Sequence, residues 1–302
     1  MKGIILAGGH GTRLYPITDV VNKQLLPVHD KPLIYYPLTT LNSSGIKDIA
    51  IISSPAEIIL FKNLLGDGTN FGVKIKYLVQ LAPNGIPEAF SIAADFINGD
   101  DVTLILGDNI FVDSGEISQL VRGFKSGASV LGYQVAEPQH FGVIVFDHHR
   151  KPIAIEEKPK KPRSNVIIPG FYIYDNSVVA MCEKLKPSPR GELEITDLNN
   201  LFLKKQSLSL KNLSRGSVWI DAGTPSALSR ASRYIAAIEE THGLKIGCPE
   251  EAALVRGFIS KRALCTYLET MPDCEYRHYL NSLIVPEFQW ASAPNIINLE
   301  AS

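Results

Sequence analysis

A glycine-rich turn with basic residues behind it is the segment of the sequence best suited to chemistry. Gly8, Gly9 and Gly11 directly follow the apolar run at 4–6. Without a Cβ, these residues let backbone N–H groups approach and surround phosphate oxygens. Arg13 adds a guanidinium that can bind phosphate through two N–H groups, and Lys23 can neutralise a second phosphate. The glycines alone fit a tight strand-to-helix turn better than a phosphate site, and Lys23 alone is more simply a solvated lysine. Arg13 strengthens the case for phosphate binding.

Two common phosphate-binding motifs do not fit this turn. A dinucleotide-binding G-x-G-x-x-G that begins at Gly9 needs a glycine where Leu14 stands. A Walker A loop needs Gly-Lys followed by Ser or Thr, whereas this chain has Gly11-Thr12-Arg13. A phosphate site in this turn therefore belongs to another class.

Three further polar residues stand where apolar runs end. Asp108 follows the run at 102–106, and Asp221 follows the run at 217–220. Carboxylate oxygens are ligands that Mg²⁺ prefers, but a turn or helix-cap role is equally open for each aspartate. Gln80 follows the run at 75–79, and its amide can offer a donor and an acceptor to a pyrimidine, although a plain strand end is the simpler interpretation.

The elements that must position these residues alternate in type along the first half. Strand-like runs lie at 4–6, 49–52, 75–79 and 102–106, and helical patterns lie between them at 32–44, 56–65 and 87–97. This alternation predicts an α/β fold with a Rossmann-like, mixed but mostly parallel sheet flanked by helices. Ligands of such sheets bind beyond the carboxyl ends of the strands.

The second half has a different pattern. Strand-like runs at 129–135, 143–146, 153–156 and 167–174 follow one another closely, which predicts a small antiparallel part. Helical patterns follow at 226–241, 250–257, 261–269 and 275–283, and we expect a helical C-terminal addition. Residues 291–302 carry little pattern.

Charge and cysteine content exclude several classes of protein. The 302 residues include 30 basic and 31 acidic side chains, a net charge of −1, which disfavours a nucleic-acid polymer as partner. The cysteines form no C-x-x-C pair, which argues against a disulfide scaffold and a zinc site. No run has the length of a signal peptide core or a membrane span, so we expect a soluble, cytoplasmic protein with no membrane partner. The four cysteines are Cys182, Cys248, Cys265 and Cys274.

The glycine turn belongs to a series of segments that together resemble the sugar-1-phosphate nucleotidylyltransferases. The first reads L-A-G-G-x-G-T-R-L-x-P-x-T from Leu6, and K-Q-L-L-P-V and K-P-L-I-Y-Y-P-L follow from Lys23 and Lys31. Later segments are G-D-N at 107–109, E-E-K-P at 156–159, R-G-E-L-E-I-T-D at 190–197 and W-I-D at 219–221. The resemblance extends from residue 1 to about residue 245 and is greatest to members that transfer a thymidylyl group.

The resemblance implies a reaction and its participants. dTTP and glucose 1-phosphate are the implied substrates, Mg²⁺ is the implied cofactor, and the products dTDP-glucose and pyrophosphate would serve dTDP-deoxysugar synthesis. It also implies the nucleotide-diphospho-sugar transferase type of fold and a homotetramer. The implied core spans 1–242, with a nucleotide-binding part at about 1–110 and a sugar-phosphate-binding part at about 111–224, and region 243–302 would make subunit contacts.

The resemblance also assigns roles residue by residue. The catalytic residues would be Arg13, Lys23, Asp108 and Lys158, and the metal ligands Asp108 and Asp221. Nucleotide binding would fall to Leu6, Ala7, Gly8, Gly9, Gly11, Thr12, Arg13, Lys23, Gln24, Gln80, Pro83, Gly85 and Asp108. Sugar-phosphate binding would fall to Asn109, Gly142, Glu157, Lys158, Ile168, Arg190 and Trp219.

Other functions are compatible with parts of this pattern. A nucleotidylyltransferase for UTP or another hexose 1-phosphate is the nearest alternative, since Phe141, Pro169, Pro87, Glu88 and Ala222 depart from the family pattern without removing a charged catalytic group. A non-catalytic sugar-nucleotide-binding regulator is disfavoured by the joint presence of the charged residues. An NAD-dependent oxidoreductase is disfavoured by the failed dinucleotide motif.

Overall fold

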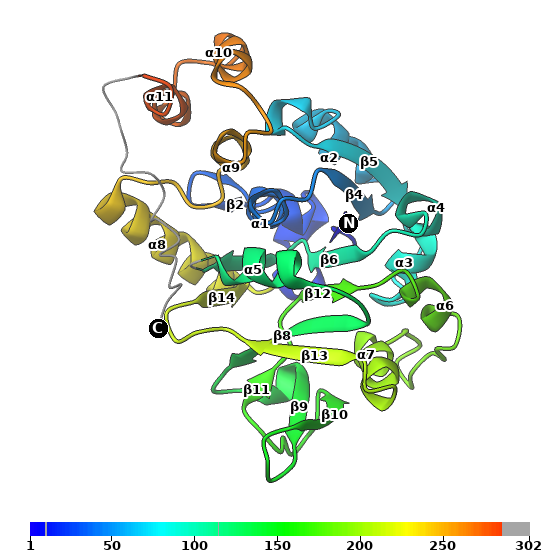
Figure 1. Cartoon of the computed structure of the whole chain (residues 1–302). Helices are drawn as coiled ribbons and strands as arrows, with labels where there is room; N and C mark the ends of the chain where they lie inside the picture. The colour runs from blue at the N-terminus through cyan, green and yellow to red at the C-terminus, as the bar shows by residue number, and fades with distance from the viewer. Residues whose placement is uncertain (10, 114, 286–302) are drawn as a thin grey trace, which may run out of the picture.

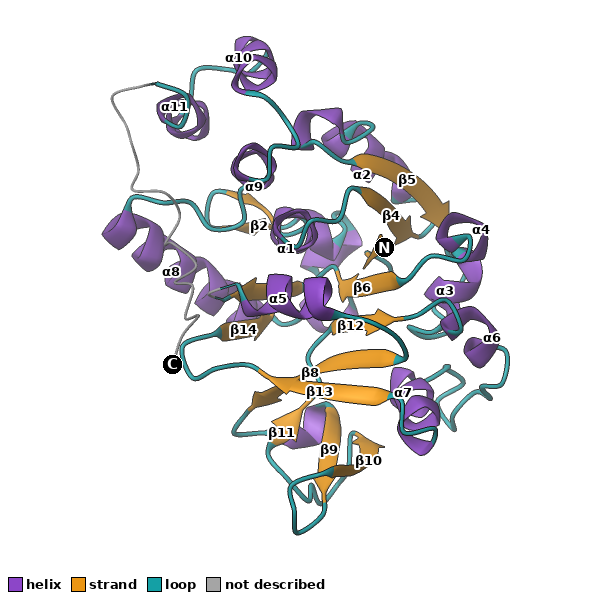
Figure 2. Ribbon diagram, in the orientation of Figure 1, coloured by secondary structure: helices purple, strands orange, loops and turns teal. Residues whose placement is uncertain are grey.

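A ten-stranded mixed sheet runs through the computed structural model, which describes residues 1–9, 11–113 and 115–285. The strands follow the order β10-β9-β11-β8-β12-β6-β1-β4-β5, and β13 pairs with β8 beside this path. Figures 1 and 2 show the sheet crossing the molecule with helices on both of its faces. The predicted mixed α/β class with helices around a parallel core is confirmed.

The parallel core consists of the four strands that the sequence predicts. They are β1 (Lys2–Leu6), β4 (Asp48–Ser53), β5 (Lys74–Val79) and β6 (Val102–Leu106), paired in the order β6-β1-β4-β5. β1 and β4 are almost entirely buried, because helices cover both faces of the sheet at this point. The carboxyl ends of these strands lead into the glycine turn, Gln80 and Asp108.

The helices divide between the two faces of the sheet. α1 (Tyr35–Ser43), α2 (Ile58–Leu65) and α5 (Glu116–Gly123) pack on one face. α3 (Glu88–Ile92), α4 (Ala94–Ile97), α6 (Val178–Cys182) and α7 (Ile195–Lys204) pack on the other. The helix predicted at 32–44 begins only at Tyr35, because Lys31–Pro32 forms β3 and pairs with β2 (Pro27–Val28). The helix predicted at 87–97 is two short helices that meet at Ala93.

The antiparallel strands continue the same sheet and do not form a separate layer. β12 (Phe171–Tyr174) pairs with β6, β8 (Ala128–Gln134) pairs with β12, and β9 (Gly142–Phe146), β10 (Pro152–Glu157) and β11 (Val166–Ile167) extend the sheet further. The single strand predicted at 167–174 is wrong: Pro169 and Gly170 separate β11 from β12, because proline has no N–H for a sheet ladder. β13 (Leu208–Asn212), α5, α6 and α7 had no predicted counterpart.

A second, two-stranded sheet carries residues of the predicted site. β7 (Asn109–Val112) follows β6 after two residues and pairs in antiparallel fashion with β14 (Val218–Asp221). Asp221 lies opposite Asn109 in this ladder, and the N–H of Ala222 donates to the carbonyl of Asp108 over 2.9 Å. The short strands therefore bring two distant segments together at the end of β6.

The four predicted C-terminal helices are confirmed to within two residues at each end. They are α8 (Pro225–His242), α9 (Pro249–Val255), α10 (Lys261–Glu269) and α11 (Glu275–Ser282). Figure 1 shows α9–α11 at the end of the molecule opposite β9–β11. None of the helices in the described ranges is long and apolar enough to cross a membrane. The four cysteines are free thiols, and the run at 291–302 lies outside the described residues.

Candidate active site

The glycine turn joins β1 to a short 3-10 helix at Thr12–Leu14. Gly9 and Gly11 have positive φ angles of 97° and 58°, a conformation that favours glycine. A Cβ on Gly11 would also come within 2.7 Å of the Thr18 methyl group. The turn leaves Thr12 and Arg13 exposed, while Leu6 and Ala7 remain held in the sheet by backbone hydrogen bonds to Gly107 and Ile52. The predicted phosphate-binding turn is therefore a preformed loop with its polar side accessible.

Two aspartates and two cations form a cluster beside this turn. Asp108, after β6, contacts the ammonium group of Lys23. Asp221, at the end of β14, lies 3.6 Å from the guanidinium of Arg13, measured from Oδ2 to Nη2. The cluster brings together all four charged residues that the sequence placed at the triphosphate and the metal.

Gly223 makes room for this cluster. A Cβ at this position would lie 2.3 Å from Arg13 Nη2 and 2.7 Å from Asp221 Oδ1. The N–H of Gly223 donates to Asp221 Oδ1 over 2.9 Å and holds that carboxylate in place. This requirement cannot be predicted from local sequence, because Arg13 and Gly223 meet only in the folded chain.

The two aspartates have pKa values shifted in opposite directions. Burial raises the pKa of Asp221, and the nearby charge of Asp108 raises it further against the effect of Arg13 and Lys23. Burial also disfavours the charge of Asp108, but the charge and hydrogen bond of Lys23, with a hydrogen bond from Asn109, hold the pKa of Asp108 below its usual range. The fold therefore keeps two carboxylates close together, and the positive charge of Lys23 mainly offsets the negative charge of Asp108.

This donor set fits Mg²⁺. Two carboxylates from neighbouring segments line one cavity, and a hard cation prefers oxygen ligands, with waters and phosphates completing its shell. The repulsion between Asp108 and Asp221 that raises the pKa of Asp221 is the interaction that a divalent cation would relieve.

A cavity of about 640 Å³ opens beside the cluster. Every residue predicted to bind the sugar phosphate lines it, together with both aspartates, Thr12 and Arg13. The seven sugar-phosphate candidates are Asn109, Gly142, Glu157, Lys158, Ile168, Arg190 and Trp219. The structure thus gathers residues from β7, β9, β10, β14 and the loops around them at one surface.

Asn109 makes contacts inside the protein as well as lining this cavity. Its Nδ2 donates to Asp108 over 2.9 Å, and its Oδ1 accepts from the Trp219 indole over 2.6 Å and from the N–H of Gly170 over 3.2 Å. The Trp219 ring is in turn packed edge-on against Phe141. Asn109 therefore fixes the orientation of Asp108, a role that its sequence position did not indicate.

Arg190 is held at the cavity by residues that sequence reasoning left without a role. Its guanidinium donates to both oxygens of Glu194, at 2.8 and 2.7 Å from Nη2, and lies 3.4 Å from Glu157. Thr196 donates to the other oxygen of Glu157 over 2.5 Å. Glu194 and Thr196 belong to the segment at 190–197 that carries the family resemblance, and this membership is the sequence feature that could have indicated their role at the site.

Lys158 reaches the same cavity from an unusual backbone conformation. Its φ is 41°, and its N–H donates to the carbonyl of Phe141 over 3.0 Å. Its ammonium group is half-exposed and lies 3.7 Å from Glu157. Lys158 therefore presents a solvent-accessible cation to the cavity, with Glu157 as its neighbour.

A second cavity, of about 520 Å³, borders the glycine turn. Four of the predicted nucleotide-binding residues line it: Gly8, Gly9, Gln80 and Pro83. Gly85 is not in its lining: its left-handed backbone, with φ 113°, packs against Leu193, where a Cβ would meet the Leu193 carbonyl at 2.1 Å. Gln24 lies buried between the turn and Gly107, and within the described ranges its Oε1 has no hydrogen-bond partner.

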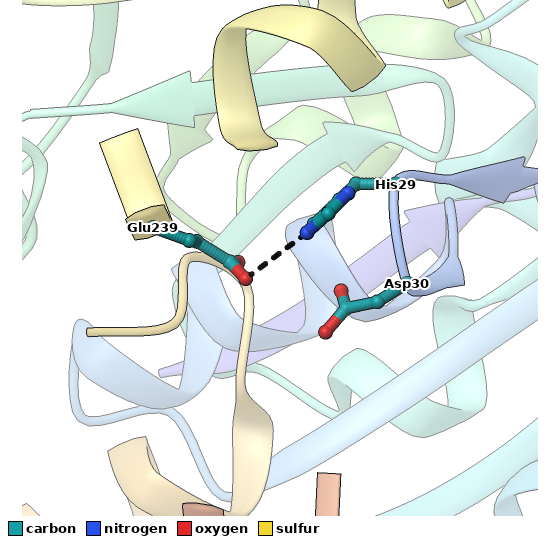
Figure 3. A group of neighbouring side chains, drawn as sticks. All are labelled: His29, Asp30 and Glu239. Carbon is teal, nitrogen blue, oxygen red and sulfur yellow. Dashed lines mark ion pairs between the residues drawn. The ribbon is translucent and has the colours of Figure 1, made fainter. Parts of the chain in front are cut away.

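One other group of side chains has the composition of a metal site. His29, Asp30 and Glu239 bring their ligand atoms within 4.8 Å of one another, with His29 Nε2 3.6 Å from Glu239 (Figure 3). Lys31 and Lys245 already lie against these carboxylates, at 3.0 and 3.2 Å from Glu239, and both also contact Asp30. The group is an ion-pair network that fastens α8 to the β2–β3 hairpin, since two ammonium groups supply its positive charge.

Comparisons with known proteins agree with this geometry. Residues 2–238 match the family model described as nucleotidyl transferase. The chain is 48% identical over 286 residues to the glucose-1-phosphate thymidylyltransferase of Mycolicibacterium smegmatis, which covers 94% of this chain and 99% of the relative. It is 49% identical over 284 residues to the enzyme of that name from Xanthomonas campestris pv. campestris, which covers 93% and 96%.

Solved structures give the same result for the fold. A crystal structure from Bacillus anthracis, described as a glucose-1-phosphate thymidylyltransferase in complex with a sucrose, is 46% identical with a TM-score of 0.73, covering 78% of this chain and 94% of that one. A UDP-glucose pyrophosphorylase with UDP-glucose shares the fold at 23% identity and a TM-score of 0.69, covering 78% and 98%. The chain belongs to the nucleotidyl transferase family.

Proposed function

We propose that the chain is a glucose-1-phosphate thymidylyltransferase, which transfers dTMP from dTTP to glucose 1-phosphate and releases pyrophosphate. The observation that carries this function is the pair of cavities, one lined by Gly8 and Gly9 of the glycine turn and the other by Thr12 and Arg13 after it, with Asp108 and Asp221 in the lining of the second. One cavity presents a glutamine amide to a base, and the other presents cations and carboxylates to a sugar phosphate. The relatives over nearly the whole chain carry the same activity in their names.

For this reaction the protein must mainly neutralise the negative charge of the two phosphate-bearing substrates and align them for attack; it forms no covalent bond to them. A phosphate oxygen of the sugar attacks the α-phosphorus of dTTP in line, and the bond to the departing pyrophosphate breaks. Attacking and leaving groups are both anions, so the site must hold them close against their repulsion. No general base is required for attack, because the sugar phosphate is already ionised at neutral pH.

The cations supply this alignment from two sides. Arg13 and Lys23 hold the triphosphate, and Arg13 lies where the charge of the leaving pyrophosphate develops. Lys158 and Arg190 hold the phosphate of the sugar. Each of these cations already faces a carboxylate in the structure, so the anionic substrates meet charges that are already oriented.

Asp108 and Asp221 are the residues that would hold Mg²⁺. Mg²⁺ held there would supply charge neutralisation of phosphate oxygens. Asn109 keeps the Asp108 carboxylate oriented, and the N–H of Gly223 does the same for Asp221. These two contacts fix the directions of the two carboxylates.

We also propose how the chain is divided into binding regions, its oligomeric state and its cellular location. The core at 1–242 binds nucleotide through about 1–110 and sugar phosphate through about 111–224, and region 243–302 contributes subunit contacts in a homotetramer. The enzyme acts in the cytoplasm and supplies dTDP-glucose for deoxysugar synthesis. Light scattering of the purified chain tests the assembly, and a monomeric mass across micromolar concentrations would contradict it.

A pyrophosphate-release assay tests the catalytic proposal. The purified chain is offered dTTP, UTP, dCTP and dATP, each with glucose, mannose or galactose 1-phosphate, in the presence of Mg²⁺ or EDTA. We expect the highest kcat/KM for dTTP with glucose 1-phosphate and loss of turnover in EDTA. Absence of release for every pair would contradict the enzyme function, and a higher kcat/KM for another pair would contradict the proposed substrates.

A further inference from the structure

The amide of Gln80 is held by a single carboxylate. Gln80 follows β5 and is only 6% exposed, and Glu88 is the first residue of α3. Gln80 Nε2 donates to Glu88 Oε2 over 2.7 Å and lies 3.4 Å from the carbonyl oxygen of Gly85. The other oxygen of Glu88 accepts from Asn84 Nδ2 over 2.8 Å. Glu88 is therefore joined to two amide groups of the loop that precedes it.

This contact decides which way the Gln80 amide points. An amide has a donor end and an acceptor end of similar shape, so neighbouring groups must choose between its two orientations. An ionised carboxylate can only accept hydrogen bonds. Glu88 therefore faces the NH₂ end of Gln80, and rotation of the amide would place two acceptor oxygens against each other.

The oxygen of Gln80 is left facing the glycine turn. A Cβ built on Gly8 would lie 3.1 Å from Gln80 Oε1, and both residues line the 520 Å³ cavity. No hydrogen bond among the described residues uses this oxygen as its acceptor. The cavity wall therefore presents an acceptor of fixed direction.

We propose that Glu88 is a positioning residue that makes the nucleotide cavity select bases with an N–H donor at N3. This inference rests on the proposed function and assigns a cause to part of its nucleotide choice. Thymine and uracil carry a hydrogen at N3 and can donate to Gln80 Oε1. Cytosine has an acceptor at N3, so it would face the same oxygen with a lone pair and leave a buried acceptor unpaired. Glu88 thus separates dTTP and UTP from dCTP and does not distinguish dTTP from UTP.

Substitution Glu88→Gln tests this role with almost no change in size. The new amide can donate or accept, so only the longer, 3.4 Å contact with the Gly85 carbonyl still favours one orientation of the Gln80 amide. We expect the ratio of kcat/KM for dTTP to that for dCTP to fall at least tenfold, mainly through the two KM values. The kcat with dTTP should change less than threefold, because Glu88 touches no reacting atom. Asp95→Asn, an exposed carboxylate-to-amide change in α4, is the matched control and should keep the parent ratio.

The double substitution Gln80→Glu with Glu88→Gln provides a rescue. It exchanges the two groups, so a carboxylate at position 80 again presents only acceptors to the cavity while the amide at position 88 donates to it. We expect this variant to restore preference for dTTP over dCTP relative to Glu88→Gln alone. A structural role for Glu88 would not predict such rescue.

The two proposals fail in distinguishable ways. If the parent chain turns over dTTP and Glu88→Gln keeps the parent ratio within twofold while folded by thermal melting, the role of Glu88 is overturned and the proposed function stands. If the parent chain releases no pyrophosphate, the proposed function is overturned, and the ratio of dissociation constants for dTTP and dCTP measured by calorimetry decides the role of Glu88. A ratio unchanged in Glu88→Gln then overturns it, and a tenfold fall supports it.

Discussion

Burial and, after it, the charge of Asp108 raise the pKa of Asp221, although Lys23 contacts Asp108 and Arg13 lies 3.6 Å from Asp221. Two carboxylates thus remain close to each other in a partly buried cluster. Repulsion between the two carboxylates lowers the stability of the free protein. The same pair of negative charges suits a site that binds a divalent cation together with phosphate oxygens. The relationship distinguishes the two aspartates, because Lys23 stabilises one of them directly.

Asparagine substitutions at the two positions are expected to have opposite effects on stability. In EDTA at neutral pH, Asp221→Asn removes a charge that burial and Asp108 disfavour, so its melting temperature should equal or exceed that of the parent. Asp108→Asn leaves the Lys23 ammonium without its partner and should lower the free energy of unfolding by about 1–3 kcal/mol. Both variants should lose at least about 100-fold in kcat with Mg²⁺. Melting temperatures that shift in the same direction would contradict this distinction.

The space at Gly223 is expected to be necessary for activity but not for folding. Gly223→Ala places a methyl group 2.3 Å from Arg13 Nη2, and the end of this long side chain can move away without disturbing the backbone. We expect melting close to that of the parent and a fall of roughly 10- to 100-fold in kcat/KM, because Arg13 is displaced from the triphosphate. Gly216→Ala is the control, since a Cβ there meets no atom within 4 Å. Parent activity in Gly223→Ala would show that Arg13 has no part in turnover.

Glu194 is expected to affect the sugar substrate through Arg190. Glu194→Gln weakens the two-oxygen contact that holds the guanidinium at the cavity, so Arg190 becomes free to adopt other rotamers. Steady-state kinetics should show about a tenfold rise in KM for glucose 1-phosphate with little change in KM for dTTP. Asp197→Asn, an exposed position in α7, should change neither constant. Equal rises in both KM values would indicate a general loss of structure.

The C-terminal helices are expected to add a measurable pH dependence to stability. Burial raises the pKa of Glu250 above 4.5, although the Tyr276 hydroxyl donates to its Oε2 over 2.6 Å. Between the unfolded and folded pKa values, the native state holds the proton that the unfolded state has lost. Stability therefore falls as pH rises through this interval and then becomes constant above it, by at most about 1.4 kcal/mol per pH unit.

Chemical denaturation of parent and Glu250→Gln from pH 4 to pH 8 measures this effect. The variant cannot ionise at position 250, so its free energy of unfolding should fall less than that of the parent over the range. Glu269→Gln alters an exposed carboxylate of α10 and should follow the parent curve. Parallel curves for the parent and Glu250→Gln would mean that Glu250 titrates alike in the folded and unfolded states.

Much of the fold is determined by local patterns in the sequence. The four parallel strands are short apolar runs, and each of the C-terminal helices carries a helical period, so both sets were predictable. α7 was not predicted, although Ile195, Leu198 and Phe202 lie buried on one face of it at helical spacing. The division of 167–174 follows from Pro169, which has no N–H for a sheet ladder.

The sequence by itself determined which chemical groups are present: a glycine turn after β1, aspartates at strand ends, and cations in segments of recognisable pattern. Only the tertiary structure decided how these groups are paired. Lys23 meets Asp108, Asn109 orients that carboxylate, Gly223 makes room for Arg13, and Glu88 fixes the amide of Gln80. Such pairings depend on the strand order and on the crossover connections, because these bring segments that are distant in the sequence within hydrogen-bond distance. The local periodicity of the sequence does not determine those distances.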